Sequence, residues 1–196
     1  FQARPVRPNY EQGFAVEENL FKYHASCYLT HAGIEALRQL KEEHRINPED
    51  VASVEQYVPK THFTVCNIPE PKTGLEVKFS MRHTAAMTLA GLDTGSLNSY
   101  SDAVAVRKDL VELRDKVTIR DKPFNSRMQS EVVINLKDSR SFSKFSDAGV
   151  PARDIDIQEE KLTKKFLSLV APVYGDKTAE NILLTCLKLE DFDDAS

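Results

Sequence analysis

The stretch EVVINLKDSRSFSKF, residues 131–145, predicts a β-hairpin and with it the class of the fold. EVVINL (131–136) and SFSKF (141–145) are rich in β-branched and aromatic residues, and the four residues between them suit a hairpin connection. Two more segments, VASVEQYVP (51–59) and KVTIRD (116–121), predict strands. Because a hairpin pairs its strands antiparallel, the sheet is expected to be at least partly antiparallel.

Helical periodicity fills the segments between these strands. A first helix is predicted from Ser26, as its N-cap, to His44 or Arg45. The small residues of FSMRHTAAMTLAGL (79–92) predict a second helix packed closely on a neighbour, and an amphipathic segment around Leu110 predicts a third. These helices have apolar stripes that can cover one face of the sheet.

Two further helices are predicted near the C-terminus. Asp156 and Glu159 resemble a capping box that opens a long amphipathic helix. Gly175 suits its C-cap, and Asp176 suits the cap of the next helix. The resulting order of helices and strands favours an α+β fold, a two-layer sandwich with a mixed, largely antiparallel sheet and packed helices.

Composition narrows the classes of function. The chain has 196 residues, 41% hydrophobic and 29% charged, with a net charge of −4, so a general nucleic-acid-binding surface is not expected. No apolar run approaches the length of a membrane helix, no secretory signal opens the chain, and three cysteines form no CxxC pair, which leads us to expect a cytoplasmic protein. The first residues, FQARPVRPNY, lack a methionine and suggest a piece of something longer. No Gly-rich phosphate loop follows a strand.

The segment HASCYLTH, residues 24–31, admits three interpretations. Cys27 and His31 share a helical face, but a zinc site needs three or four ligands, and an N-cap at Ser26 would leave His24 off that face, so we expect no metal. Alternatively, Lys22 beside a helix N-terminus forms an anion site suited to a carboxylate, with His31 available for proton transfer. The third interpretation is an ordinary capped helix with a solvated lysine and structural histidines.

A second polar cluster is SMRH, residues 80–83. Arg82 can bind a carboxylate through two hydrogen bonds, and His83 can exchange protons. The alternative is a helix start with a surface arginine. Lys164 and Lys165 fit a solvated helix face.

Taken together, the two clusters resemble a known family. LFKYHASCYLTHAGIEAL (20–37) is similar to the MmgE/PrpD segment in which a lysine precedes Ser-Cys-x-x-x-His and a helix. GLEVKFSMRHTAAMTLAG (74–91) resembles the next signature of that family, and the order of the hairpin and of the later segments also agrees. The resemblance covers roughly residues 15–175.

The resemblance implies an enzyme that acts on small di- or tricarboxylates without metal or cofactor, by proton abstraction next to a carboxylate. Members dehydrate 2-methylcitrate, decarboxylate cis-aconitate or epimerise iminodisuccinate, and they are commonly homodimers in which a helical N-terminal domain precedes an α+β lid. It implies an irregular lead-in (1–19), a lid-type domain (20–156) and C-terminal helices (157–189) that pack on the missing helical domain.

Residue by residue, the resemblance implies that Lys22 is the active-site lysine and that His83 occupies the position of a family tyrosine. Ser26, Cys27 and His31 match the motif after the lysine and are expected to line the substrate site, together with Arg82. We therefore predict part of a lyase of the 2-methylcitrate dehydratase type, inactive by itself. The alternative is a non-catalytic α+β binding or interaction module.

Overall fold

The computed structural model describes residues 15–192, and its central feature is a four-stranded sheet. The strands are β1 (Val51–Val58), β2 (Val117–Asp121), β3 (Gln129–Leu136) and β4 (Ser141–Asp147), in the spatial order β2-β1-β3-β4. β1 runs parallel to β2 and antiparallel to β3, and β3 is antiparallel to β4. The prediction of a mixed, largely antiparallel sheet is confirmed.

The hairpin between β3 and β4 closes as the sequence predicts. Asn135 pairs with Ser141, and the main-chain N–H of Leu136 donates to the Arg140 carbonyl at 2.8 Å. Ser139 takes a left-handed conformation, with φ of 71°, and its N–H donates to the Leu136 carbonyl at 3.1 Å. A non-glycine residue therefore provides the positive φ that the connection needs.

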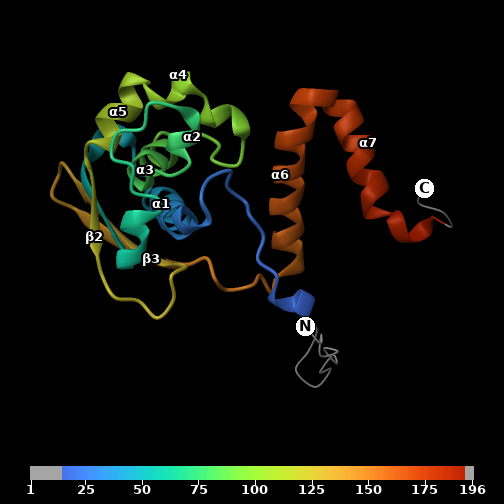
Figure 1. Cartoon of the computed structure of the whole chain (residues 1–196), viewed down its shortest axis with the longest axis horizontal. Helices are drawn as coiled ribbons and strands as arrows, with labels where there is room; N and C mark the ends of the chain where they lie inside the picture. Colours follow the sequence, from blue (N-terminus) through green and yellow to red (C-terminus); the bar gives the residue numbers. More distant parts are fainter. Residues whose placement is uncertain (1–14, 193–196) are drawn as a thin grey trace, which may run out of the picture.

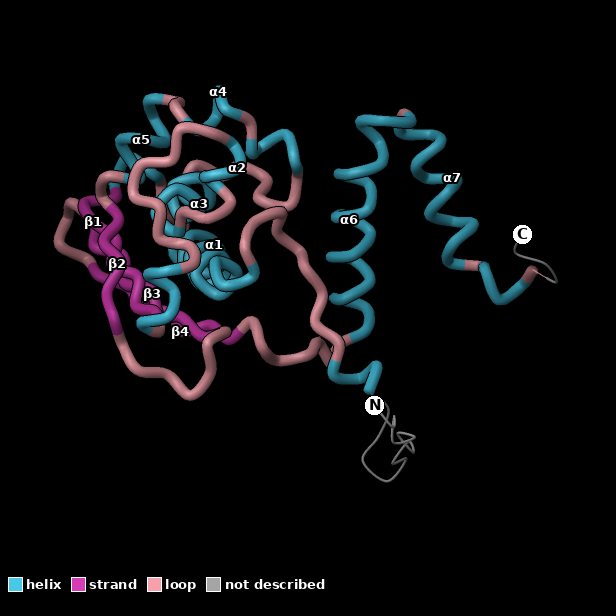
Figure 2. Tube along the Cα trace, in the orientation of Figure 1, coloured by secondary structure: helices cyan, strands magenta, loops and turns pink. Residues whose placement is uncertain are grey.

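Helices cover one face of this sheet and form the second layer (Figures 1 and 2). α1 (His31–His44) packs on β3, β4 and α3 (Met81–Leu89), and α3 packs on α5 (Lys108–Arg114). The main core lies between the two layers, where burial of apolar surface supplies most of the stabilisation. Its fully buried members include Leu37, Leu40, Val54, Val132 and Ile134.

A smaller apolar cluster lies beyond the first, around two short helices. α2 (Gly74–Val77) and α4 (Asp102–Ala105) contact each other, and the buried cluster beside them consists of Val77, Met87, Tyr100, Ala105 and Leu110. This cluster fixes the segment that enters α3, and with it the SMRH residues.

The last two helices form an arm beside the α+β body (Figure 1). α6 (Ile155–Tyr174) and α7 (Asp176–Leu187) pack mainly on each other, and no residue of α6 is fully buried. The arm touches the body through Lys165, whose Nζ donates to the Gly95 carbonyl at 2.8 Å, and through Lys161, which lies 5.2 Å from the centre of the Tyr23 ring. No helix within residues 15–192 is both long and apolar enough to cross a membrane.

Several predicted helix boundaries are wrong. α1 begins at His31 after a 3₁₀ turn, Tyr28–Thr30, and Ser26 does not cap it because its Oγ bonds to Thr30 Oγ1 at 2.7 Å. Asp154, rather than Asp156, caps α6 by accepting the N–H of Ile157.

Gly175 does end α6, as predicted, but it also occupies the cap position of α7, so that Asp176 is the first residue inside that helix. Of the expected irregular lead-in, residues 1–14 lie outside the described part of the chain, and Ala15–Glu18 form a 3₁₀ helix.

Replacing Gly74 with alanine tests the close approach at the start of α2. A Cβ at this position would lie 1.7 Å from the Tyr100 carbonyl oxygen, and the Gly74 N–H donates to Asp102 at 2.8 Å. Because main-chain atoms must move, Gly74→Ala is expected to lower the free energy of unfolding by about 1–3 kcal/mol. Urea denaturation measures this change. The neighbouring exposed Leu75 provides the control, since Leu75→Ala should cost much less; equal costs would contradict the proposed clash.

Candidate functional site

The segment that carries HASCYLTH is held on the body by main-chain hydrogen bonds. The N–H of Ala25 donates to the Thr94 carbonyl, and the N–H of Cys27 donates to the Lys78 carbonyl, both at 2.9 Å. The Cys27 carbonyl in turn accepts the N–H and the Oγ1 hydroxyl of Thr30. Residues 24–30 are thereby ordered before α1 begins, and Ser26 is buried among them.

His24 fixes the same segment through its side chain. Its Nδ1 lies 2.7 Å from Thr94 Oγ1 and its Nε2 lies 3.1 Å from Glu35 Oε1. Burial acts to raise the pKa of Glu35, but the hydrogen bonds from His24 and Arg38 outweigh it and hold the pKa at about 2. His24, which the sequence analysis set aside as a metal ligand, therefore ties the site segment to α1.

His31 is buried against two other rings at the start of α1. Its ring centre lies 4.6 Å from that of Tyr28 in a stacked arrangement and 4.8 Å from that of His24 in an edge-on arrangement. Burial lowers the pKa of His31 to about 3, and the charges of His24 and Lys22 add to this effect. Its Nε2 has no hydrogen-bond partner within residues 15–192. The imidazole is consequently neutral at neutral pH.

Cys27 is half-buried and packs against the core cluster that contains the buried Cys66. The interaction with the Cys66 thiol lowers the pKa of Cys27 against the opposing effect of burial, and the charges of Lys22 and Arg127 lower it further. The same contact, together with burial, raises the pKa of Cys66. Cys27 is therefore the member of this pair that is suited to carry a negative charge.

Four cations are linked to this position through their charges: Lys22 and Arg127 act on Cys27, and Lys22 and Lys78 act on Lys165. Lys22 is exposed, and its charge acts on Cys27, His31 and Lys165. Burial lowers the pKa of Lys165, and the charges of Lys22 and Lys78 lower it further, although Asp93 opposes them. The fourth cation is Arg127, whose carbonyl bonds to His62 Nε2 at 2.8 Å.

The sequence interpretation of Lys165 as a solvated side chain is wrong. It is half-buried and hydrogen-bonded to Gly95. The sequence included Lys78 only as part of the second family signature, and no sequence signal pointed to Arg127. The charge effects that link residues 22, 78, 127 and 165 join segments that are far apart in the sequence.

The SMRH cluster lies deeper than its sequence suggests. Ser80 caps α3 by accepting the His83 N–H at 3.2 Å, and Arg82 donates to Asn67 Oδ1. His83 is fully buried, and burial lowers its pKa to about 4, with Arg114 adding to the effect. Among the described residues, no hydrogen bond or ring contact joins His83 to Lys22. The charge of Lys22 thus acts on Cys27 and His31. Arg82 and His83 interact instead with Asn67, Ser80 and Arg114.

Two hollows lie near this group, and His31 lines one of them while Lys165 lines the other. A pocket of about 270 Å³ is lined by His31, Tyr28 and Glu35 together with the start of α6, and a groove of about 920 Å³ runs between α1, residues 91–95 and α6. Lys22 and Cys27 line neither of them. Within residues 15–192, no three His, Cys, Asp or Glu side chains gather closely enough to hold a metal ion.

Fold and site together define a class: an α+β domain that carries a cation-rich segment, with a thiol and a neutral histidine, beside an arm of two helices. The chain belongs to the MmgE/PrpD family, since the model of the MmgE/PrpD C-terminal domain matches residues 24–191. The match begins two residues after Lys22.

The chain is also similar, at low identity, to two curated proteins. The chain is 29% identical to the cis-aconitate decarboxylase of Mus musculus over 136 residues, which are 66% of this chain and 27% of that protein. It is 25% identical to the cis-aconitate decarboxylase of Homo sapiens over 183 residues, 90% of this chain and 37% of that protein. The chain thus matches only about a third of the length of these relatives.

The burial of His31 predicts a dependence of stability on pH. Its pKa is about 3 in the folded chain, against an ordinary value near 6.5 when unfolded, so unfolding takes up a proton between these limits. Stability is therefore full above about pH 6.5 and falls as the pH drops towards 3. In His31→Gln the slope of unfolding free energy against pH should be shallower by up to one proton, about 1.4 kcal/mol per pH unit.

Urea denaturation at several pH values between 7 and 4 measures this slope. The exposed His44 offers a control, since His44→Gln also removes an imidazole but not a buried one. Slopes that coincide for the wild type and His31→Gln would show that His31 is not the group responsible.

Proposed function

We propose that this chain is the C-terminal, substrate-closing part of a cofactor-independent lyase or isomerase that acts on small di- or tricarboxylates, most closely of the 2-methylcitrate dehydratase type. The observation that carries the proposal is that the charge of Lys22 acts on Cys27, His31 and Lys165. The names of the relatives support a lyase whose substrate is a polycarboxylate.

The chemistry follows from the charge that develops next to a carboxylate. Removal of a proton from the carbon beside a carboxylate moves negative charge onto the carboxylate oxygens, and fixed cations stabilise that charge more than they stabilise the substrate. In this proposal Lys22 binds the carboxylate, while Lys78, Arg127 and Lys165 raise the local positive potential. Cys27 and His31 line the site in this proposal. His31 is neutral and therefore adds no charge to it.

His83 is the proposed proton acceptor. His83 is assigned this role by the family resemblance, and a pKa of about 4 leaves it neutral and able to accept a proton at neutral pH. Its complete burial means that a substrate reaches it only if the surrounding helices move or a second domain rearranges them. Arg82 and Ser26 are also proposed to bind substrate, but their side chains form hydrogen bonds to other residues of the body.

The site is proposed to be half of a complete one. Lys22 and Cys27 stand outside the two hollows, and the relatives are about three times as long as the matched region. We propose that a helical N-terminal domain supplies the facing wall and the remaining catalytic groups, and that the whole enzyme is a cytoplasmic homodimer. By itself the chain is expected to be inactive.

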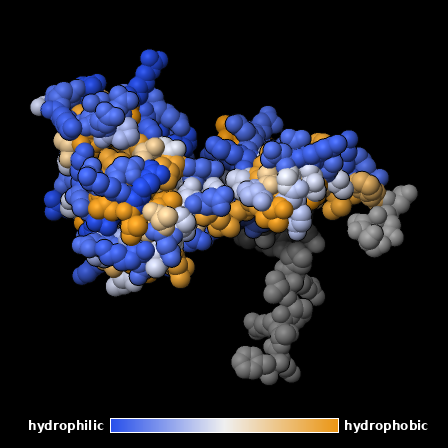
Figure 3. Space-filling model, turned by 90° about the horizontal axis from the view of Figure 1, so that it is seen from above, coloured by the Kyte–Doolittle hydropathy of each residue, from blue (hydrophilic) through white to orange (hydrophobic). Residues whose placement is uncertain are grey.

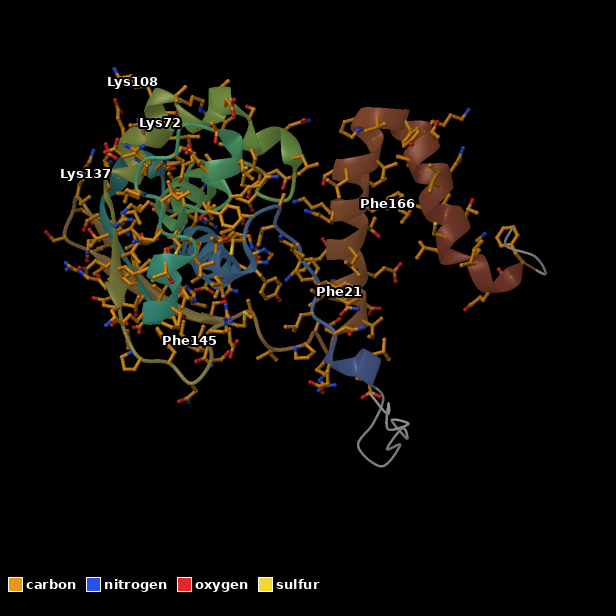
Figure 4. The ribbon with its side chains drawn as sticks, in the orientation of Figure 1. Phe21, Lys72, Lys108, Lys137, Phe145 and Phe166 are labelled. Carbon is orange, nitrogen blue, oxygen red and sulfur yellow. The ribbon has the colours of Figure 1, made fainter. Side chains whose placement is uncertain are left out.

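Lys22→Ala in the full-length enzyme tests the central residue. Loss of a cation that stabilises developing charge is expected to lower kcat/KM for a small polycarboxylate at least about 100-fold while the thermal transition stays in place. A screen of 2-methylcitrate, cis-aconitate and related acids identifies the substrate to be used. Lys137→Ala, at the opposite edge of the body (Figure 4), is the control and should leave turnover unchanged.

Normal turnover in Lys22→Ala would remove this residue from the mechanism. Turnover by the 196-residue chain alone would overturn the proposal of a half site. If no polycarboxylate is converted by the full-length protein, while the chain still binds such acids through Lys22, the binding-module alternative takes its place.

The helical arm gives a second test of the proposal that this chain is only part of the enzyme. Figure 3 shows apolar residues along the arm, and Val173, Leu184 and Leu187 are each more than half exposed. Large exposed apolar patches rarely persist in monomers, so the isolated chain is expected to self-associate at high concentration. Leu184→Lys with Leu187→Lys should reduce this association in light scattering, whereas Leu75→Lys, on α2, should not. A wild-type chain that stays monomeric throughout would count against a partner for the arm.

A further inference from the structure

The groove of about 920 Å³ between the body and the helical arm is a hollow to which the proposed reaction assigns no ligand. Lys22 and Cys27 do not line it. One of its walls includes the C-terminal end of α1 and the residues that follow α3, whereas the SMRH residues lie at the start of α3. The other wall is α6, which stands beside the body (Figure 1). A hollow of this volume can hold a small organic molecule.

Cationic side chains outnumber carboxylates in the lining of this groove, six to four. Arg38 neutralises two of the carboxylates, because its Nη1 and Nη2 lie 2.9 Å from oxygens of Glu42 and Glu35. Within residues 15–192 no ion pair is formed by the other lining charges, which are Asp93, Glu160, Lys41, Arg45, Lys161, Lys164 and Lys165. The charge of Asp93 does act on Lys165. The groove therefore has an excess of unpaired positive charge.

Lysines reach this groove from both of its walls. On the body, Lys41 Nζ lies 3.1 Å from the point that a Cβ of Gly91 would occupy, and Gly91 has a φ of 78° that favours glycine. On the arm, Lys165 Nζ donates to the Gly95 carbonyl at 2.8 Å, and Lys161 lies 5.2 Å from the centre of an aromatic ring. These partners are neutral, so neither lysine loses its charge to a carboxylate there.

We propose that this groove binds small organic polyanions, that is, molecules with two or more phosphate or carboxylate groups and an apolar portion. One anionic group is bound by Lys41 and Arg45 of the body, and another is bound by Lys164 of the arm. Clefts lined by charges of one sign concentrate ligands of the opposite sign. The apolar portion contacts the apolar side chains of the lining, which are Ile34, Ile46, Leu92 and Ile157.

A ligand in this position would also fasten the arm to the body. The two meet at this groove through Lys161 and Lys165, and no residue of α6 is fully buried. A polyanion that binds Lys41 and Lys164 together adds an attachment between them. The amide hydrogens of α6 should therefore exchange more slowly when the ligand is bound. Neither Lys22 nor turnover enters this proposal, so it does not rest on the proposed function.

Isothermal titration calorimetry of the 196-residue chain at low salt tests the groove with three probes. ATP has phosphates and an apolar base, tripolyphosphate has phosphates alone, and citrate has carboxylates. At least one probe should show saturable binding, which weakens at high salt because ions screen exposed charges. Tightest binding of ATP identifies a nucleotide type of ligand, and tightest binding of citrate identifies a polycarboxylate. Tightest binding of tripolyphosphate would contradict the role of the apolar side chains.

Variants matched in charge assign the binding to the groove. Lys41→Gln and Lys164→Gln should each weaken it about two- to fivefold, as the loss of a partly exposed charge does. Lys137→Gln, at the far edge of the body (Figure 4), should not. Glu42→Gln should tighten binding about twofold because it removes a carboxylate from the lining. Glu43→Gln makes the same change in charge next to it, but outside the lining, and should have much less effect.

The outcomes separate this proposal from the proposed function. Absence of binding by all three probes, or binding that survives both Lys41→Gln and Lys164→Gln in variants shown to be folded by circular dichroism, would overturn it. Lys41 and Arg45 would then only balance the main-chain carbonyls at the end of α1. If Lys22→Ala abolishes binding and the groove variants do not, the anion binds at the proposed substrate site and the groove proposal fails. Binding that Lys22→Ala leaves unchanged supports the groove, whether or not the full-length enzyme turns over.

Discussion

The contact between α1 and β1 is the constraint on which the rest of the molecule depends. Gly33 has no side chain, and the amide of Gln56 occupies the space that a Cβ would need, 2.1 Å from its ideal position. Gln56 is itself buried and donates weakly to Ser130 on β3, at 3.4 Å. This close approach lets α1 lie against the sheet, and α1 carries both His31 and Glu35 to the site.

Side chains of α1 also hold the segment that precedes this helix. Glu35 holds His24, His24 holds Thr94, and the Thr94 carbonyl accepts both the Ala25 N–H and the Tyr100 hydroxyl. Lys22 lies in a segment that is neither helix nor strand. Side chains from distant parts of the sequence nevertheless fix the residues that follow it.

Polar groups that are buried beside the site lower the stability of the folded chain. His31 and His83 are both held neutral by burial, and ring nitrogens of each lack hydrogen-bond partners within residues 15–192. An unpaired buried polar atom typically costs about 1–3 kcal/mol. Residues of this kind often mark functional positions, and both lie in the two segments whose sequences resemble the family signatures.

The sequence by itself determined the fold class, the hairpin and the family, because strand alternation, turn residues and local motifs are properties of short stretches. It also singled out Lys22, Cys27 and His31, which lie within ten residues of one another. Only the tertiary structure decided that α1 starts at His31, since Ser26 bonds to Thr30 instead of capping the helix. Only the tertiary structure decided that the charge of Lys22 acts on Lys165 and that His83 is enclosed, because contacts between distant segments depend on how helices pack on the sheet.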